Sequence, residues 1–146
     1  MRPTRITRPF AGRDHAFDVA PLGTIEALER ACNAGMGEIL SRLQGDTWRE
    51  GDKVAYQPRF RHADIRETIR LGLMGAGMSE PEATALIRDT VDGRPVMPFL
   101  VLAVEIVVAY AHGVDDAVKK SEGPAGEAMA PPPGPETSVP TLPPAS

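Results

Sequence analysis

The stretch from Gly72 to Ser79 comes nearest to a known catalytic or ligand-binding motif. It reads GLMGAGMS, which matches the phosphate-loop pattern G-x-x-x-x-G-K-[S/T] except that Met78 occupies the lysine position. A phosphate loop needs a buried strand before its glycines, but a pattern of helical period precedes them here. We therefore predict a turn between two helices and no nucleotide site. In this turn, Gly72 and Gly75 would let another backbone approach closely.

The histidines, the single cysteine and the isolated acid do not form a catalytic or metal-binding set. His15, His62 and His112 fall in a predicted turn, at a helix start and at a helix end, and none shares a helix face with a second ligand. Cys32 lies on an apolar helix stripe, where a core role is expected, and it has no second cysteine for a disulfide. Glu105 should pair with an arginine, face solvent or contact a partner. We predict no catalytic, cofactor-binding or metal-binding residue, and so a protein that is not an enzyme.

Five segments have apolar residues at the helical spacing of three and four, and these segments are the predicted helices. They run from about Leu22 to Cys32, from Met36 to Leu43, from Ala63 to Ala76, from an N-cap at Ser79 to Val91, and from Pro95 to Gly113. Ser79 and Glu82 have the spacing of a capping box. The last segment is almost uniformly apolar, so we expect it to be the central helix around which the others pack.

Two segments outside the helices could form strands. Residues 4–20 alternate weakly around the turn signal AGRD, which predicts a short N-terminal β-hairpin, with a disordered arm as the alternative. Residues 45–60 fit either a small hairpin around Glu50-Gly51-Asp52 or an irregular loop. Of these we expect the loop, with Trp48 and Tyr56 packed against the helices. The predicted fold class is mainly α, with about five helices and a short N-terminal β-hairpin.

The composition changes near the C-terminus. Residues 124–146 hold eight of the 15 prolines and no aromatic residue, so they cannot bury enough apolar surface to offset the entropy lost on ordering. We predict a helical domain over residues 1–116 and a disordered Pro-rich tail over residues 117–146.

Charge and hydropathy narrow the range of partners. Up to residue 113 the chain has 14 basic and 15 acidic residues, which differs from the strongly basic balance of nucleic-acid-binding proteins. The apolar run from Pro95 to Gly113 is shorter than the roughly 20 residues of a membrane span and is broken by Pro98. We expect neither a nucleic-acid partner nor a membrane partner.

A DNA-binding helix-turn-helix is an alternative interpretation of residues 59–91. Two predicted helices are joined there by a glycine-containing turn, and a basic cluster lies nearby, composed of Arg59, Arg61, His62, Arg66 and Arg70. However, the second helix would have to read the bases, and its sequence SEPEATALIRD is rich in acids. Its charge has the wrong sign for that role.

Two runs of the sequence resemble a known family. PLGTIEALERACNAGMGEILSRL and RETIRLGLMGAGMSEPEATALI, followed by an apolar helix, are similar to the small tail protein of gene transfer agents and related phages. That family is described as tail assembly chaperone-like and sometimes as tail tube protein. The most characteristic parts are Leu22–Glu29 and Ile69–Gly77, and the resemblance covers about Phe10 to Asp116.

The resemblance implies a non-enzymatic protein of tail morphogenesis. It implies a tail assembly chaperone that binds the tape-measure protein and other tail proteins, and it is compatible with a homo-oligomer. A structural tail tube component is the alternative, although a tube subunit would need long alternating strands and only one weak hairpin is predicted. The implied location is the cytoplasm of a bacterial host, or the particle itself.

The predicted partner-binding surface comes from the third and last helices. The last helix has more apolar surface than four short neighbours can cover, and exposed apolar surface of this kind marks a binding site. Methionine adds a flexible side chain that adapts to many partners. The predicted residues are Ile69, Leu73, Met74, Phe99, Val104 and Val108. The alternative for each of them is an ordinary place in the core.

We predict that ATP and GTP do not bind at about 1 mM, because the phosphate-contacting lysine and the preceding strand are absent from the Gly72–Ser79 stretch. Isothermal titration calorimetry measures this directly. A saturable heat that disappears in the Gly77→Val variant would contradict the prediction of a helix–helix turn.

Overall fold

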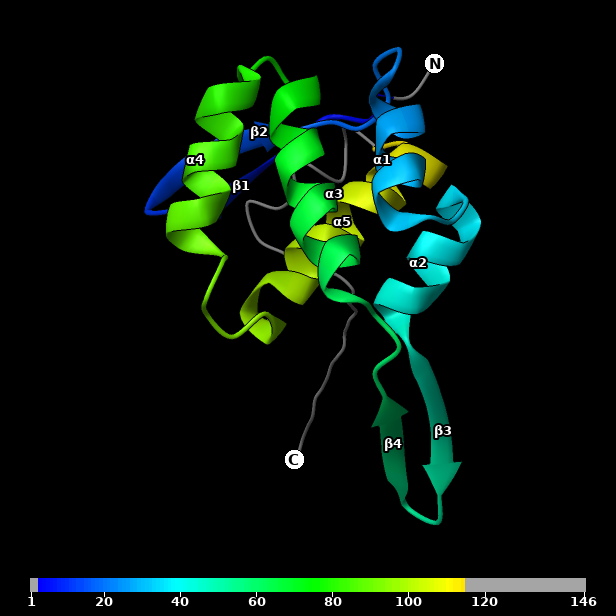
Figure 1. Cartoon of the computed structure of the whole chain (residues 1–146). Helices are drawn as coiled ribbons and strands as arrows, with labels where there is room; N and C mark the ends of the chain where they lie inside the picture. The colour runs from blue at the N-terminus through cyan, green and yellow to red at the C-terminus, as the bar shows by residue number, and fades with distance from the viewer. Residues whose placement is uncertain (1–2, 115–146) are drawn as a thin grey trace, which may run out of the picture. The chain divides into compact units, whose positions relative to one another are not determined.

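The structure is a computed structural model that describes residues 3–114. Its elements follow one another as β1 (Ile6–Phe10), β2 (Arg13–Phe17), α1 (Thr24–Cys32), α2 (Met36–Gln44), β3 (Asp46–Glu50), β4 (Lys53–Gln57), α3 (His62–Gly75), α4 (Glu80–Thr90), the 3₁₀ helix η1 (Met97–Phe99) and α5 (Leu100–His112) (Figure 1). The five predicted helices and the N-terminal hairpin are confirmed. The predicted domain end at residue 116 and the predicted disordered tail, residues 117–146, lie outside the described residues.

The N-terminal hairpin forms because its turn residues and its apolar residues favour the same pairing of the two strands. Strands β1 and β2 pair antiparallel from Ile6 opposite Phe17 to Phe10 opposite Arg13. The two connecting residues, Ala11 and Gly12, both have positive φ, 55° and 87°, which is the type I′ turn that suits the twist of a hairpin. Phe10 then packs edge-on against Phe17, and also against Phe99 of η1, with ring centroids 6.0 Å apart in both pairs.

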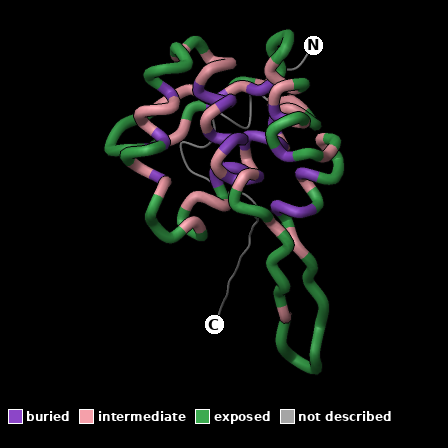
Figure 2. The backbone as a smooth tube through the Cα atoms, viewed as in Figure 1, coloured by how far each residue is buried: buried purple, intermediate pink, exposed green. Residues whose placement is uncertain are grey.

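Helix α3 is the centre of the fold. It packs against α1, α2, α4, α5 and β2, and it is buried along most of its length (Figure 2). The expectation that the last helix is central is therefore wrong. Helix α5 packs on α3, α2 and β1, but Val101 on its open side stays 66% exposed, because no described element covers that side.

The close backbone approach predicted at Gly72 and Gly75 is confirmed. The chain leaving β2 crosses α3 at these glycines, and the Asp18 amide donates to the Gly72 carbonyl oxygen at 2.9 Å. A Cβ atom on Gly75 would lie only 1.9 Å from the Asp18 carbonyl oxygen. The absence of a side chain at Gly75 is what lets the N-terminal hairpin rest on α3.

The remainder of the glycine-rich stretch ends α3 and begins α4. The Met78 amide donates to the Leu73 oxygen and the Gly77 amide to the Met74 oxygen, both at 3.0 Å, while Gly77 has φ 119°. This is the hydrogen-bond pattern of a Schellman C-cap. Ser79 Oγ then accepts from the Glu82 amide at 3.3 Å and caps α4. The residues that resemble a phosphate loop therefore provide hydrogen-bond partners for the backbone groups at the end of α3 and at the start of α4.

The expectation of an irregular loop over residues 45–60 is wrong. Strands β3 and β4 pair antiparallel from Asp46 opposite Gln57 to Glu50 opposite Lys53, around a two-residue turn whose first residue, Gly51, has φ 63°. The hairpin points away from the helices (Figure 1), and every residue of β3 is exposed. Trp48 and Tyr56 are not packed into the helical core.

The variant Gly75→Ala should lower the free energy of unfolding by about 3 kcal/mol, because the new methyl group meets the rigid backbone oxygen of Asp18. Gly37→Ala is the matched control, since Gly37 also lies in a helix but has no atom within 4 Å of an added Cβ. That control should raise stability by roughly 0.5–1 kcal/mol. Urea denaturation of both variants measures the difference, and equal stabilities would contradict the described approach of Asp18 to α3.

Candidate functional site

The base of the β3–β4 hairpin is held by close contacts at both of its ends. Gly45, between α2 and β3, has φ 71°, and a Cβ atom there would lie 2.7 Å from both Tyr56 Cε1 and the Gln57 oxygen. On the return side, Arg59 Nη1 lies 3.6 Å from Asp46 Oδ1. The two strands are therefore drawn together where they join the helical body.

Beneath this base lies a buried ion pair between Arg42 of α2 and Asp64 of α3. Arg42 Nη2 and Nε donate to Asp64 Oδ1 and Oδ2 at 2.6 and 3.0 Å, and the two residues are 4% and 0% exposed. Arg42 Nη2 also donates to the Cys32 oxygen at the end of α1, at 3.1 Å. The Asp64 carboxylate accepts from the Arg61 amide at 2.8 Å, so it caps the start of α3 as well.

This environment also decides the chemistry of Cys32. Burial, followed by the charge of Asp64, raises the pKa of the Cys32 thiol to about 12. The hydrogen bond from Arg42 to Asp64 also raises the pKa of the arginine, so the guanidinium group stays charged. At neutral pH the thiol is protonated, and Cys32 is a core residue rather than a nucleophile.

Most of the basic cluster near α3 is paired with acids. Arg66 donates from Nε and Nη2 to the Asp92 carboxylate at 2.9 and 3.0 Å, and this bonding lowers the pKa of Asp92. Arg70 Nη2 lies 2.6 Å from Glu67 Oε1, and Arg66 contacts Glu67 too. Guanidinium groups neutralised in this way offer little free positive charge to a phosphate backbone.

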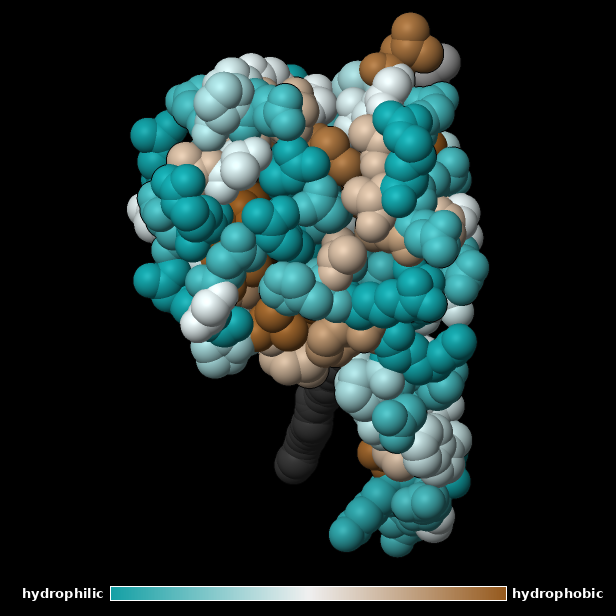
Figure 3. Space-filling view, viewed as in Figure 1, coloured by the Kyte–Doolittle hydropathy of each residue, from teal (hydrophilic) through white to brown (hydrophobic). Residues whose placement is uncertain are grey.

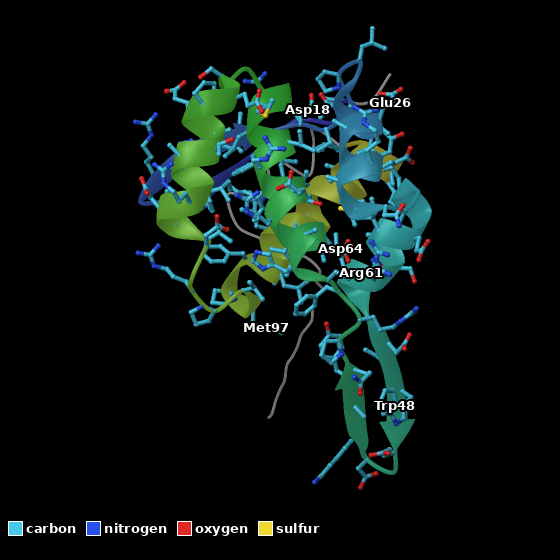
Figure 4. All side chains as sticks on the ribbon, in the orientation of Figure 1. Asp18, Glu26, Trp48, Arg61, Asp64 and Met97 are labelled. Carbon is cyan, nitrogen blue, oxygen red and sulfur yellow. The ribbon has the colours of Figure 1, made fainter. Side chains whose placement is uncertain are left out.

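Large exposed apolar side chains gather on the hairpin and beside it. Of the large hydrophobic residues that are exposed in the described part of the chain, only Leu22 lies elsewhere. The others are Trp48, Val54 and Tyr56 on the hairpin, Met97 in η1 and Val101 in α5. Figure 3 shows hydrophobic atoms at the edge of the body near the start of the hairpin, and Figure 4 places Met97 at that edge.

An apolar groove of about 300 Å³ connects the hairpin with α5. Tyr56 forms one wall and the first two turns of α5 form the other, above the end of α2. The complete lining is Leu43, Gln44, Tyr56, Leu100, Val101, Val104 and Glu105. Glu105 is paired with Arg8 of β1 at 3.1 Å, so its carboxylate is already engaged. The groove therefore presents mainly apolar side chains, and the one carboxylate in its lining is held in an ion pair.

The six predicted partner-binding residues are not brought together in this groove. Ile69 and Leu73 are 0% and 1% exposed and belong to the core. Met74, Phe99 and Val108 are half-buried and do not line the groove, whereas Val104 does. Binding through these residues stays a prediction, and Val104 is the one placed where a partner would meet the groove.

The groove residues that the sequence prediction missed are chiefly Tyr56 and Val101. The signal for Tyr56 was the hairpin interpretation of residues 45–60, with Gly51-Asp52 as its turn. Val101 had no local signal, because every position near it is also apolar. Only the packing of α5 separates its covered side from its open one.

Residues 3–114 contain neither a metal-binding cluster nor a membrane-spanning helix. Within that range, no group of three or more His, Cys, Asp or Glu side chains is placed to hold a metal ion. None of the helices described is long and apolar enough to cross a membrane.

Taken together, the fold and the site define a small, mainly helical protein with a projecting hairpin and an apolar groove between that hairpin and α5. Residues 4–113 match the family model described as "Phage tail tube protein, GTA-gp10", and the chain belongs to this family. No curated protein and no solved structure matches the chain. The resemblance to a gene-transfer-agent tail protein is thus confirmed.

Removing one partner of the buried ion pair should destabilise the protein strongly. Asp64→Asn leaves Arg42 buried without its counter-charge, and we expect a loss of about 3–5 kcal/mol in the free energy of unfolding. The double variant Arg42→Met with Asp64→Leu should recover most of this loss. Arg59→Ala is the control, because its exposed pair with Asp46 is worth less than about 1 kcal/mol. Denaturant unfolding of the three variants checks this, and an equal loss in all three would contradict it.

Proposed function

We propose that this protein is a non-enzymatic component of a phage-like tail that acts by binding other tail proteins through the β3–β4 hairpin and the adjacent groove. The observation that carries the proposal is the concentration of exposed apolar side chains on these two features. Tyr56 and Val101 share the groove, and Val54 lies on the same face of the hairpin as Tyr56, whereas Trp48 lies on the opposite face. Exposed apolar side chains grouped in this way mark interaction sites. Membership in a phage tail tube protein family supplies the setting.

The first form of the proposal is a structural component of the tail tube. It is supported by the description of the family as a tail tube protein. The hairpin supports it physically, because β3 and β4 form a sheet of two strands with an open edge on each side. An open edge can accept a strand from a neighbouring subunit. In this form the protein stays in the finished particle and binds further copies or other tube proteins.

The second form is a tail assembly chaperone for the tape-measure protein. It is supported by the groove, whose lining in α2 and α5 includes four aliphatic side chains that could pack against the apolar stripe of a client helix: Leu43, Leu100, Val101 and Val104. Met97, which is 49% exposed in η1 and three residues before Leu100 of the groove, has a side chain that adapts to varied partners. The chaperone form is also supported by the length of the described strands, which have five residues each. The wall of a tail tube would need longer strands.

We expect Val101→Asp to lower the yield of gene-transferring or infectious particles by at least about tenfold, because a carboxylate in an apolar contact costs more than one decade of affinity. Val101 is 66% exposed and second in α5, where a negative charge is favourable to the helix, so the variant should fold. Leu22→Asp is the matched control, since Leu22 is 99% exposed and lies outside the groove. Equal yields for the two variants would contradict a role for the groove.

The presence or absence of the wild-type protein in finished particles distinguishes the tail tube form of the proposal from the chaperone form. Quantitative mass spectrometry of purified particles should detect a tube component in numbers comparable to other tail proteins. A chaperone should instead be missing from particles and co-purify with co-expressed tape-measure protein, in a manner lost in Val101→Asp. Retardation of duplex DNA at physiological salt, with no binding to either tail protein, would support the helix-turn-helix alternative instead.

A further inference from the structure

The two open edges of the β3–β4 hairpin present different backbone groups. The two-residue turn makes Glu50 and Lys53 a hydrogen-bonded pair, and paired residues of an antiparallel ladder alternate between bonded and non-bonded. Arg49 opposite Val54, and Thr47 opposite Tyr56, are therefore non-bonded pairs whose amide and carbonyl groups point outward. The open edge of β4 thus offers the backbone groups of Val54 and Tyr56.

The side chains of the two edge strands also differ. Strand β3 has the sequence DTWRE, with a charge at three of its five positions, whereas Lys53 is the only charged residue of β4, KVAYQ. Charged residues along an edge discourage further strand pairing. Val54 is 66% exposed and Tyr56 is 40% exposed, and both are residue types that favour strand pairing. The β4 edge is therefore the one suited to accept another strand.

We propose that a second copy of this chain pairs with the β4 edge through its own β4, antiparallel and about a two-fold axis at Ala55. In this register Val54 of each copy faces Tyr56 of the other, and both residues have their backbone groups directed outward. Two such pairs exchange about four backbone hydrogen bonds. The result is a four-stranded sheet in the order β3, β4, β4, β3.

Charge and shape both favour this register. Lys53 of each copy faces the neutral Gln57 of the other, whereas the same two-fold pairing of β3 would place Asp46 opposite Glu50, a repulsive contact. Val54 of the second copy also arrives beside Tyr56, at the mouth of the groove that Val101 lines. Pairing would thus bring the exposed side chains of Val54 and Tyr56 against each other and add strands to a hairpin that is marginal alone.

This inference rests on the first form of the proposed function, in which an open edge of the hairpin binds a further copy, and it deepens that form by naming the β4 edge and the register. Its test needs only the full-length chain and no other tail protein. It can therefore fail while the proposed binding to tail proteins stands, and the reverse also holds.

Sedimentation equilibrium of the full chain should show a dimer that dissociates on dilution. Val54→Pro removes an outward amide of β4 without removing a bond of the hairpin itself, so the dissociation constant should rise by at least about tenfold, since each copy loses one donor. Arg49→Pro is the matched control, because it removes the equivalent outward amide from β3. It should leave the dimer intact, and circular dichroism should show the same helix content in both variants.

A cysteine at the two-fold axis gives an independent test. Ala55 would face Ala55 as a non-bonded pair with Cα atoms about 4.5 Å apart, within the range of a disulfide. In a Cys32→Ala background, Ala55→Cys should give a covalent dimer on mild oxidation, whereas Trp48→Cys, the matching position of β3, should not. A chain that is monomeric at all concentrations would overturn the proposal. So would disulfides formed only between Ala55→Cys and Trp48→Cys chains in a mixture, because these indicate head-to-tail pairing.

Discussion

The buried ion pair between Arg42 and Asp64 is the interaction on which the placement of the β3–β4 hairpin and its groove depends. It joins the last turn of α2 to the first turn of α3, which are the points where the chain departs for the hairpin and returns from it. The same guanidinium group holds the end of α1 through the Cys32 oxygen. A bidentate salt bridge is directional, so it fixes the relative position of these helix ends. Apolar contacts are not directional and do not do this.

Away from this ion pair, the proposed binding surface lies where no described helix covers the apolar side chains of α5 and the hairpin. Helix α5 buries one side against α3 and α2 and leaves Val101 in water. The hairpin has no core of its own, since every residue of β3 is exposed, and short two-stranded hairpins are marginal in isolation. In the proposed function, burying these features against a partner would contribute free energy that the monomer cannot obtain.

The sequence predicted the helices well because each has a local signature, but it predicted the hairpin and the helical centre poorly. An alternating pattern identifies a strand when one face is apolar, and DTWRE and KVAYQ have mixed residues on both faces. Helix α3 was not recognised as central because two of its acidic residues, Asp64 and Glu67, are buried in ion pairs. In the sequence, these charges look the same as those of a solvent-exposed face. Of the predicted partner-binding residues, Ile69 and Leu73 are in the core because apolar character alone does not separate a covered face from an open one.

The sequence by itself determined the features that depend on only a few consecutive residues. They include the type I′ turn with Gly12, the end of α3 at Gly77 and the capping of α4 by Ser79. Their causes are the allowed backbone angles of glycine and the reach of a short hydroxyl side chain. Only the tertiary structure decided that Arg8 meets Glu105, or that Tyr56 and Val101 share a groove. These contacts join residues far apart in the chain, and their geometry comes from how whole elements pack rather than from any local preference.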